Sequence, residues 1–209
     1  MKLRFGEFVA LIAVLLSATL AFSALTAGIA FALNLPHPGM LITLVGYFGL
    51  LFAVTKTRNS AMGLLFVFLL TGFMGYTLGP ILNMYVKALP NGHSVIVNAF
   101  AITAVTFVGL SAYAVKSGRD FSFMRGFLLV GVIAAFVLGL VAIFFHQPTL
   151  SLAVSGLFVL LMSGMILWQT SDILQGGETN YIMATLNLYV SIFNLFTSLL
   201  HILGVWSED

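Results

Sequence analysis

The sequence predicts an all-α fold: a polytopic membrane bundle of seven transmembrane helices with the C-terminal helix at its centre. Three observations lead to it. Of 209 residues, 61% are apolar and only 7% are charged, whereas a soluble domain carries about 25% charged residues. Apolar runs near the length that crosses a bilayer, about 20 residues, follow one another with no interval long enough for a soluble domain. The last run also carries a continuous polar stripe.

This polar stripe recurs every three or four residues, which places it on one helix face. Its members are Asn187, Ser191, Asn194, Ser198 and His201. A helix in lipid closes its own backbone hydrogen bonds but leaves such side chains unpaired, so the striped face must turn toward protein or a water-filled cavity. We therefore expect the last helix inside the bundle, with the stripe either lining a pathway or joining helices by hydrogen bonds.

The whole chain, residues 1–209, is predicted to form a single seven-helix transmembrane domain. The expected spans are 8–33, 39–55, 60–87, 94–115, 121–145, 149–172 and 180–205. The first run also resembles a signal peptide, but it continues well past the small residues Ala21, Ser23 and Ala24, which favours a retained helix.

Small residues and prolines indicate where helices approach each other or bend. Ala24, Gly28 and Ala32 repeat at four-residue spacing, which favours close helix contact. Gly79 and Pro80 lie late in the third span, where proline removes a helix hydrogen bond. They predict either a helix break or a glycine-lined packing face with a kink.

The turn before the last helix carries its own start signal. Gly176 and Gly177 end the sixth span, and Thr179 or Asn180 is expected to cap the seventh.

Basic residues predict the orientation, because cytoplasmic loops carry an excess of lysine and arginine. With the N-terminus in the cytoplasm, that side receives Lys2, Arg4, Lys56, Arg58, Lys116, Arg119 and Arg125. The opposite side receives only Lys87. The sequence therefore predicts a multi-pass membrane protein with a cytoplasmic N-terminus and a C-terminus outside the cytoplasm. The small positive surplus gives no reason to expect a nucleic-acid partner.

Residues with catalytic chemistry are sparse. The chain has no cysteine, and it contains no zinc-protease, nucleophile-elbow or phosphate-loop motif. Its four histidines are scattered without metal-ligand spacing. We therefore expect no enzyme activity, no cofactor and no metal site. Asp172, one turn after Gln169, is either a solvated carboxylate beside a loop or a functional partner of the stripe.

Several segments together resemble the Bax-inhibitor (transmembrane BAX inhibitor motif) family. They are Gly72–Leu82 (GFMGYTLGPIL), Ala99–Ala104, Arg119–Phe123 (RDFSF) and Leu188–Leu200 with its Asn-Leu-Phe. The segment Gln175–Ile182 (QGGETNYI) is similar to the proteobacterial YccA branch of that family. The resemblance implies seven spans with the last helix central.

The resemblance also implies candidate activities. Some family members are pH-sensitive calcium leaks gated by two acids, and the matching positions here are Gln169 and Ser191, which do not ionise. The YccA branch instead resembles a regulator, and also a poor substrate, of the membrane-anchored ATP-dependent protease FtsH. FtsH grips substrates by a cytoplasmic tail, and the tail of this chain before the first span is short, which favours a partner that blocks the protease over a substrate.

We therefore predict a protein that modulates FtsH by lateral helix contacts within the lipid bilayer. The alternatives are a cation leak or exchanger, moving calcium or protons along Asn187, Ser191, Asn194 and Asp172, and a membrane partner that only packs.

Overall fold

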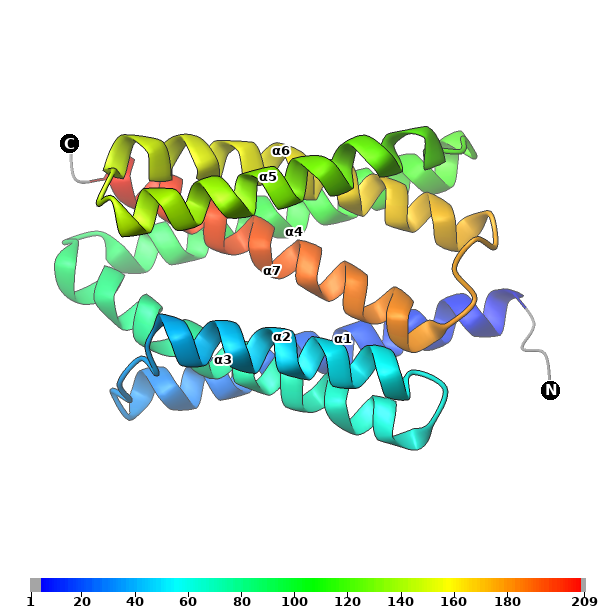
Figure 1. Ribbon diagram of the computed structural model, residues 1–209, viewed down its shortest axis with the longest axis horizontal. Helices are drawn as coiled ribbons and strands as arrows, with labels where there is room; N and C mark the ends of the chain where they lie inside the picture. The colour runs from blue at the N-terminus through cyan, green and yellow to red at the C-terminus, as the bar shows by residue number, and fades with distance from the viewer. Residues whose placement is uncertain (1–4, 208–209) are drawn as a thin grey trace. The chain divides into compact units, whose positions relative to one another are not determined.

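A computed structural model describes residues 5–207 of the chain, and these residues form seven long helices (Figure 1). They are α1 (Phe5–Ala32), α2 (Met40–Thr57), α3 (Ala61–Ala88), α4 (Gly92–Ser117), α5 (Arg125–Phe144), α6 (Pro148–Leu174) and α7 (Tyr181–Trp206). A short 3-10 turn, η1 (Ser122–Met124), precedes α5. All seven spans are long and apolar enough to cross a membrane. The predicted all-α membrane fold is confirmed, while the predicted cytoplasmic residues Lys2 and Arg4 lie outside the described residues.

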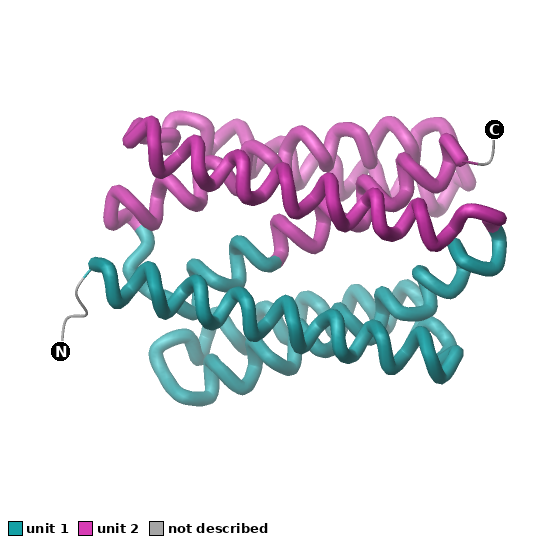
Figure 2. Tube along the Cα trace, turned by 180° about the vertical axis from the view of Figure 1, so that it is seen from behind, with its two compact units in different colours: residues 1–88, 178–189 teal, residues 89–177, 190–209 magenta. Residues whose placement is uncertain are grey.

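The chain divides into two compact units, coloured separately in Figure 2. Unit 1 comprises residues 1–88 and 178–189, and unit 2 comprises residues 89–177 and 190–209. The helix α7 is continuous and contributes its first half to unit 1 and its second half to unit 2. In both units the order of helices is long, short, long, and the third helix packs against the other two. That the chain folds as one domain stays a prediction.

In unit 1, a glycine face of α3 packs directly on the backbone of α1. A Cβ atom added at Gly75 would collide with the Ser23 carbonyl and with Thr26 Oγ1. One added at Gly79 would lie 2.7 Å from the Ala27 carbonyl oxygen. Only glycine permits this approach, which lets long stretches of two helices gain van der Waals contact in an apolar solvent.

This packing bears on two expectations. Of the two alternatives at Gly79 and Pro80, the helix break is wrong and the glycine-lined packing face is the one observed. The helix α3 runs through Gly79 and Pro80 without a break, because the turns around Pro80 are held against α1 and the glycines serve the packing face. The face of α1 expected at Ala24, Gly28 and Ala32 was the wrong one. All three are exposed, and no atom lies within 4 Å of a Cβ built at Gly28.

In unit 2, α5 and α6 interlock through reciprocal leucine and glycine contacts. A Cβ atom added at Gly131 of α5 would lie 2.6 Å from Leu161 Cδ2 of α6. One added at Gly164 of α6 would lie 2.7 Å from Leu128 Cδ2 of α5. Each leucine therefore fills the space that a glycine leaves on the facing helix, a close-packed arrangement suited to helices that lack a hydrophobic driving force between them.

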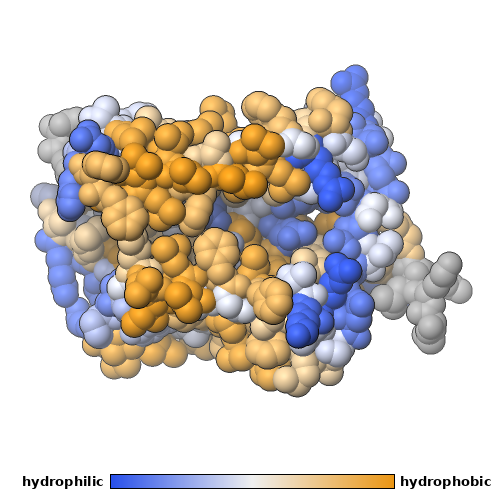
Figure 3. Space-filling model, in the orientation of Figure 1, coloured by the Kyte–Doolittle hydropathy of each residue, from blue (hydrophilic) through white to orange (hydrophobic). Residues whose placement is uncertain are grey.

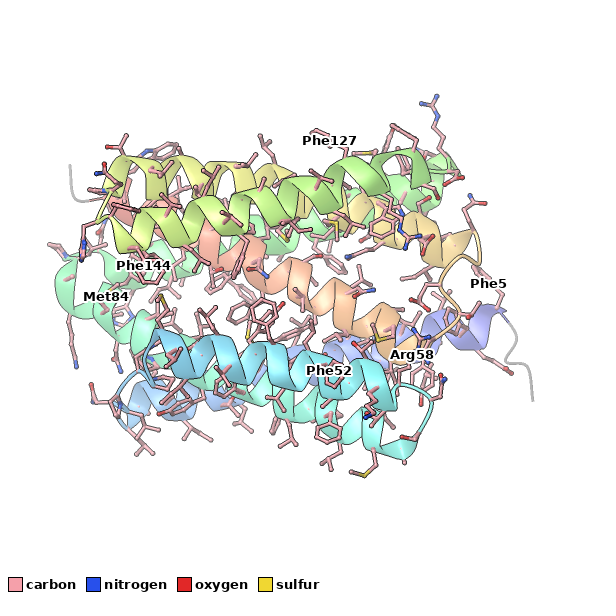
Figure 4. The ribbon with its side chains drawn as sticks, in the orientation of Figure 1. Phe5, Phe52, Arg58, Met84, Phe127 and Phe144 are labelled. Carbon is pink, nitrogen blue, oxygen red and sulfur yellow. The ribbon has the colours of Figure 1, made fainter. Side chains whose placement is uncertain are left out.

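The outer surface is strongly apolar, as expected for helices that face acyl chains. Phe52 of α2 and Phe127 of α5, both labelled in Figure 4, are 68% and 74% exposed. Figure 3 shows hydrophobic residues across the middle of the visible face and hydrophilic residues gathered toward its ends. By contrast, half of the most apolar window of α7 is buried, against 6% for α2. The last helix is therefore an interior helix.

Candidate functional site

The centre of the polar stripe in unit 2 is a hydrogen bond between α7 and α6. The Ser191 hydroxyl donates to Gln169 Oε1 at 3.1 Å, and both side chains are buried. The two helices are joined by a short loop and run in opposite directions, so the polar positions late in α6 meet those in the middle of α7. Gln169 and Ser191 are thus in direct contact, as a pair of neutral side chains.

A second hydrogen bond joins the same two helices farther along. His201 Nδ1 lies 2.7 Å from Ser155 Oγ, which also donates to the carbonyl of Ser151 in its own helix. The sequence pattern pointed to His201 but gave no reason to choose Ser155, since α6 contains several serines in an apolar run. Two hydrogen bonds, from Ser191 and from His201, therefore join α7 to α6 at two positions along the helices.

The remaining stripe residues of unit 2 turn to their own helix or into the core. Asn194 Nδ2 donates to the Val190 carbonyl, one turn earlier, at 2.8 Å and is half-buried. Ser198 is buried. Neither Asn194 nor Ser198 adds a charge to the interior.

Asp172 lies apart from the Gln169–Ser191 pair. It is half-buried in the last turn of α6, and its carboxylate lies against Gly177 in the loop that follows. Gly176 adopts φ +75° here, and the Gly177 N–H donates to the Asp172 carbonyl, which ends the helix. The Asp172 carboxylate therefore lies at the C-terminal end of α6, beside the loop that leads to α7.

In unit 1, the first half of α7 is held by a tyrosine that the sequence analysis missed. The buried Tyr189 hydroxyl lies 2.7 Å from Ser23 Oγ of α1 and donates to the Thr71 carbonyl of α3 at 3.3 Å. Asn187, the first residue of the stripe, is half-buried. A tyrosine in the middle of an apolar span was the available signal, because a buried phenol needs a hydrogen-bond partner.

The start of α7 is also fastened to unit 1. Asn180 Oδ1 accepts the Met183 N–H at 3.0 Å, so Asn180, rather than Thr179, is the helix cap. Its Nδ2 donates to the Arg58 carbonyl at 3.0 Å and to Asn59 Oδ1 at 2.8 Å. One side chain thus starts α7 and holds the loop between α2 and α3.

A matching arrangement fixes the basic loop of unit 2. Ser171 Oγ of α6 donates to the Arg119 carbonyl at 2.8 Å and accepts the Phe121 N–H at 3.3 Å. Asp120 Oδ1 accepts the Ser122 N–H at 2.8 Å, and this interaction with Ser122 holds the pKa of the exposed Asp120 carboxyl below its usual range. The Asp120 carboxylate therefore hydrogen-bonds the first residue of η1.

These contacts define what the interior can do. Among the described residues, the buried serines, threonines and amides carry no charge, and no aspartate, glutamate, lysine, arginine or histidine is fully buried. Residues 5–207 also contain no group of three histidine or acidic side chains that could hold a metal ion. Two buried groups, Trp168 Nε1 and Thr185 Oγ1, have no hydrogen-bond partner. The interior is polar enough to join helices but contains no buried acid that could titrate.

Comparisons with known proteins agree with the fold. Residues 7–208 match the family model described as inhibitor of apoptosis-promoting Bax1. The chain is 55% identical to an uncharacterised protein of Pseudomonas aeruginosa over 93% of this chain and 87% of that protein. It is 50% identical to the Escherichia coli K12 protein named modulator of FtsH protease YccA, over 93% of this chain and 88% of that protein. The E. coli O6:H1 relative, with the same identity and coverage, is named inner membrane protein YccA. This multi-pass membrane chain therefore belongs to the Bax-inhibitor family.

Proposed function

We propose that this protein resides in the inner membrane and modulates the FtsH protease by binding it, without catalysis of its own. The observation that carries the proposal is the 50% identity, over 93% of this chain, to the E. coli modulator of that protease. The N-terminus lies in the cytoplasm and the C-terminus in the periplasm, in accord with the basic residues at the proposed cytoplasmic ends of the helices.

The polar site supports a binding role over an ion path. At the two positions that carry acids in leak-forming relatives, this chain has the hydrogen-bonded Ser191 and Gln169. A proton cannot gate a pair that does not ionise. The site therefore fixes α7 to α6 and gives the protein a stable surface for a partner.

The exposed face of α2 in unit 1 and the exposed face of α5 in unit 2 are two separate candidate surfaces. Within α2, Val54 alone is fully buried, and Phe52 and Phe127 are largely exposed. Large apolar side chains on rigid helices are suited to lateral contact with the membrane-spanning part of another protein.

Co-purification and degradation assays test the proposal together. The full chain should co-purify with FtsH from detergent-solubilised membranes and should change the rate at which FtsH degrades a membrane substrate. Because the chain has no cysteine, the single variants Phe52→Cys and Phe127→Cys allow crosslinking from α2 or α5 alone. Failure to co-purify, combined with an unchanged degradation rate, would refute the proposal.

A cation leak is the second candidate, favoured by one observation. The half-buried Asp172, an acid, lies one helical turn from Gln169. Calcium-dye flux into liposomes that contain the purified protein tests it. A pH-dependent flux that Asp172→Asn abolishes would rank the leak above protease binding.

A further inference from the structure

A shallow groove of about 330 Å³ lies in unit 1, where the loop after α1 meets the last turns of α3. Its lining residues are Asn34, Leu35, Pro36, His37, Pro80, Asn83, Met84 and Lys87. The α3 members recur at spacings of three and four, so they share one helix face. The groove is thus built from one loop and one helix face, and none of its lining residues belongs to α7.

Hydrogen bonds hold the walls of the groove in place. Asn83 Nδ2 donates to the Phe31 carbonyl at 2.7 Å, and the Tyr76 hydroxyl donates to the Pro36 carbonyl at 3.0 Å. Asn34 adopts φ +51° at the end of α1, and the Leu35 N–H closes that end on the Ala30 carbonyl. The loop is therefore preorganised, so a ligand would not have to order it.

The polar groups in the groove favour an anion. Lys87 Nζ donates to Asn34 Oδ1 at 2.7 Å, which leaves two of the three ammonium hydrogens for a ligand. His37 Nδ1 accepts the Gly39 N–H at 3.0 Å, so the neutral ring carries its hydrogen on Nε2 as a further donor. No lining residue is acidic. A cation and a second N–H donor face no competing carboxylate in the groove.

The apolar surroundings distinguish a lipid from a free anion. The groove lies at the ends of spanning helices, where the phosphate groups of a bilayer lie. Of its lining residues, the apolar Met84, labelled in Figure 4, is 57% exposed, and Leu33, which precedes Asn34 in the sequence, is 65% exposed. Acyl chains have a surface to follow beside the groove, whereas a free anion gains nothing from it.

We propose that this groove binds the phosphodiester headgroup of an anionic phospholipid, with Lys87 as its main charged contact. The lipid then occupies a defined site between the loop after α1 and the last turns of α3. This site is independent of protease binding, because none of its residues belongs to α7 or to the exposed faces of α2 and α5.

Photocrosslinking tests the site directly. The full chain is reconstituted in nanodiscs with a photoactivatable phosphatidylglycerol, and adducts are mapped on the peptides that cover residues 33–41 and 80–88. The control variant is Lys116→Gln, which removes an exposed lysine from the last turn of α4 just as Lys87→Gln removes one from the last turn of α3. A lysine near a membrane contributes about 1 kcal/mol to binding an anionic lipid, or about fivefold in affinity.

The expected result is a loss of about fivefold in groove adducts for Lys87→Gln and little change for Lys116→Gln. Asn34→Gly, which keeps the left-handed turn but removes the side chain that holds Lys87, should also lower the yield. Equal labelling by a phosphatidylcholine probe, or full competition by inorganic phosphate, would overturn the proposal. So would unchanged labelling in a folded Lys87→Gln protein.

Discussion

The Ser191 hydroxyl donates a hydrogen bond to Gln169 Oε1 at 3.1 Å and so joins α7 to α6 in the buried part of unit 2. Two carboxylates facing each other at such positions would repel, which makes a pair of acids sensitive to pH. A hydroxyl and an amide lack this property. The same location is therefore a fixed helix contact in this chain.

Removal of the Ser191 hydroxyl should destabilise the protein measurably. Ser191→Ala leaves the buried Gln169 without this donor, and interhelical hydrogen bonds in membranes contribute about 0.6 to 1.7 kcal/mol. The free energy of unfolding in detergent should fall by about that amount. The control is Ser17→Ala, which removes an exposed hydroxyl bonded to its own helix at Ala13 and should change little. Equal effects of the two variants would contradict the account.

The close packing of α3 on α1 predicts opposite results for two glycines. Gly75→Ala places a methyl group against Thr26 and the Ser23 backbone, and overpacking of this kind costs about 1 to 3 kcal/mol. Gly28→Ala meets no atom within 4 Å and should be neutral or slightly stabilising, because alanine favours the helix. Thermal unfolding in detergent measures both. A tolerated Gly75→Ala would mean that the two helices do not approach this closely.

Asn180 is expected to stabilise both the start of α7 and the loop between α2 and α3. Asn180→Ala removes a helix cap, at about 1 kcal/mol, and two further hydrogen bonds to Arg58 and Asn59. Asn180→Asp keeps an acceptor for the Met183 N–H but loses both donors, so its stability should be intermediate. Thr179→Ala serves as the control, because Thr179 is exposed. If Thr179→Ala proved the more damaging change, the cap would be assigned to the wrong residue.

The Asp120 turn should respond to acid. Its interaction with Ser122 lowers the pKa of Asp120 below the usual value of 3.8. A carboxyl with a depressed pKa in the folded state stabilises the protein above its unfolded pKa, and this contribution is lost as the pH falls through the folded pKa. The amide signal of Ser122 should therefore titrate with a midpoint below 3.8, and Asp120→Asn should abolish that titration. A midpoint at or above 3.8 would show that the carboxylate does not accept this bond.

The number and position of the helices could be predicted because polar and charged residues interrupt the apolar runs. The end of α1 and the start of α2 flank a Pro-His-Pro-Gly turn, and the start of α7 follows a capping asparagine. Such signals are local, so the sequence alone contains them. The predicted spans and the observed helices differ by only a few residues at their ends.

The faces of the helices were harder to predict. Ala24, Gly28 and Ala32 form a small-residue pattern as regular as the one that packs, which is Ser23, Ala27 and Ala30. In a helix of a soluble protein, polar residues would show which face is exposed to water. A membrane helix is apolar all round, so the sides that face lipid and protein have the same composition.

The candidate site was predicted in part. The polar period of α7 identified Ser191 and His201, since such side chains need partners in a membrane. Their partners Gln169 and Ser155 lie on α6, and Tyr189 reaches α1 and α3. These pairings depend on how antiparallel helices align along their length, which spacing within one helix does not reveal.

The most direct test of the central claim is the rate at which purified FtsH degrades a membrane substrate in proteoliposomes, with and without this protein. The account predicts that the degradation rate depends on the amount of this protein. The Asp172→Asn variant should change that rate by the same amount as the unaltered protein. The proteoliposomes should show no pH-dependent calcium flux. A degradation rate unchanged at excess protein, together with calcium flux that Asp172→Asn abolishes, would contradict it.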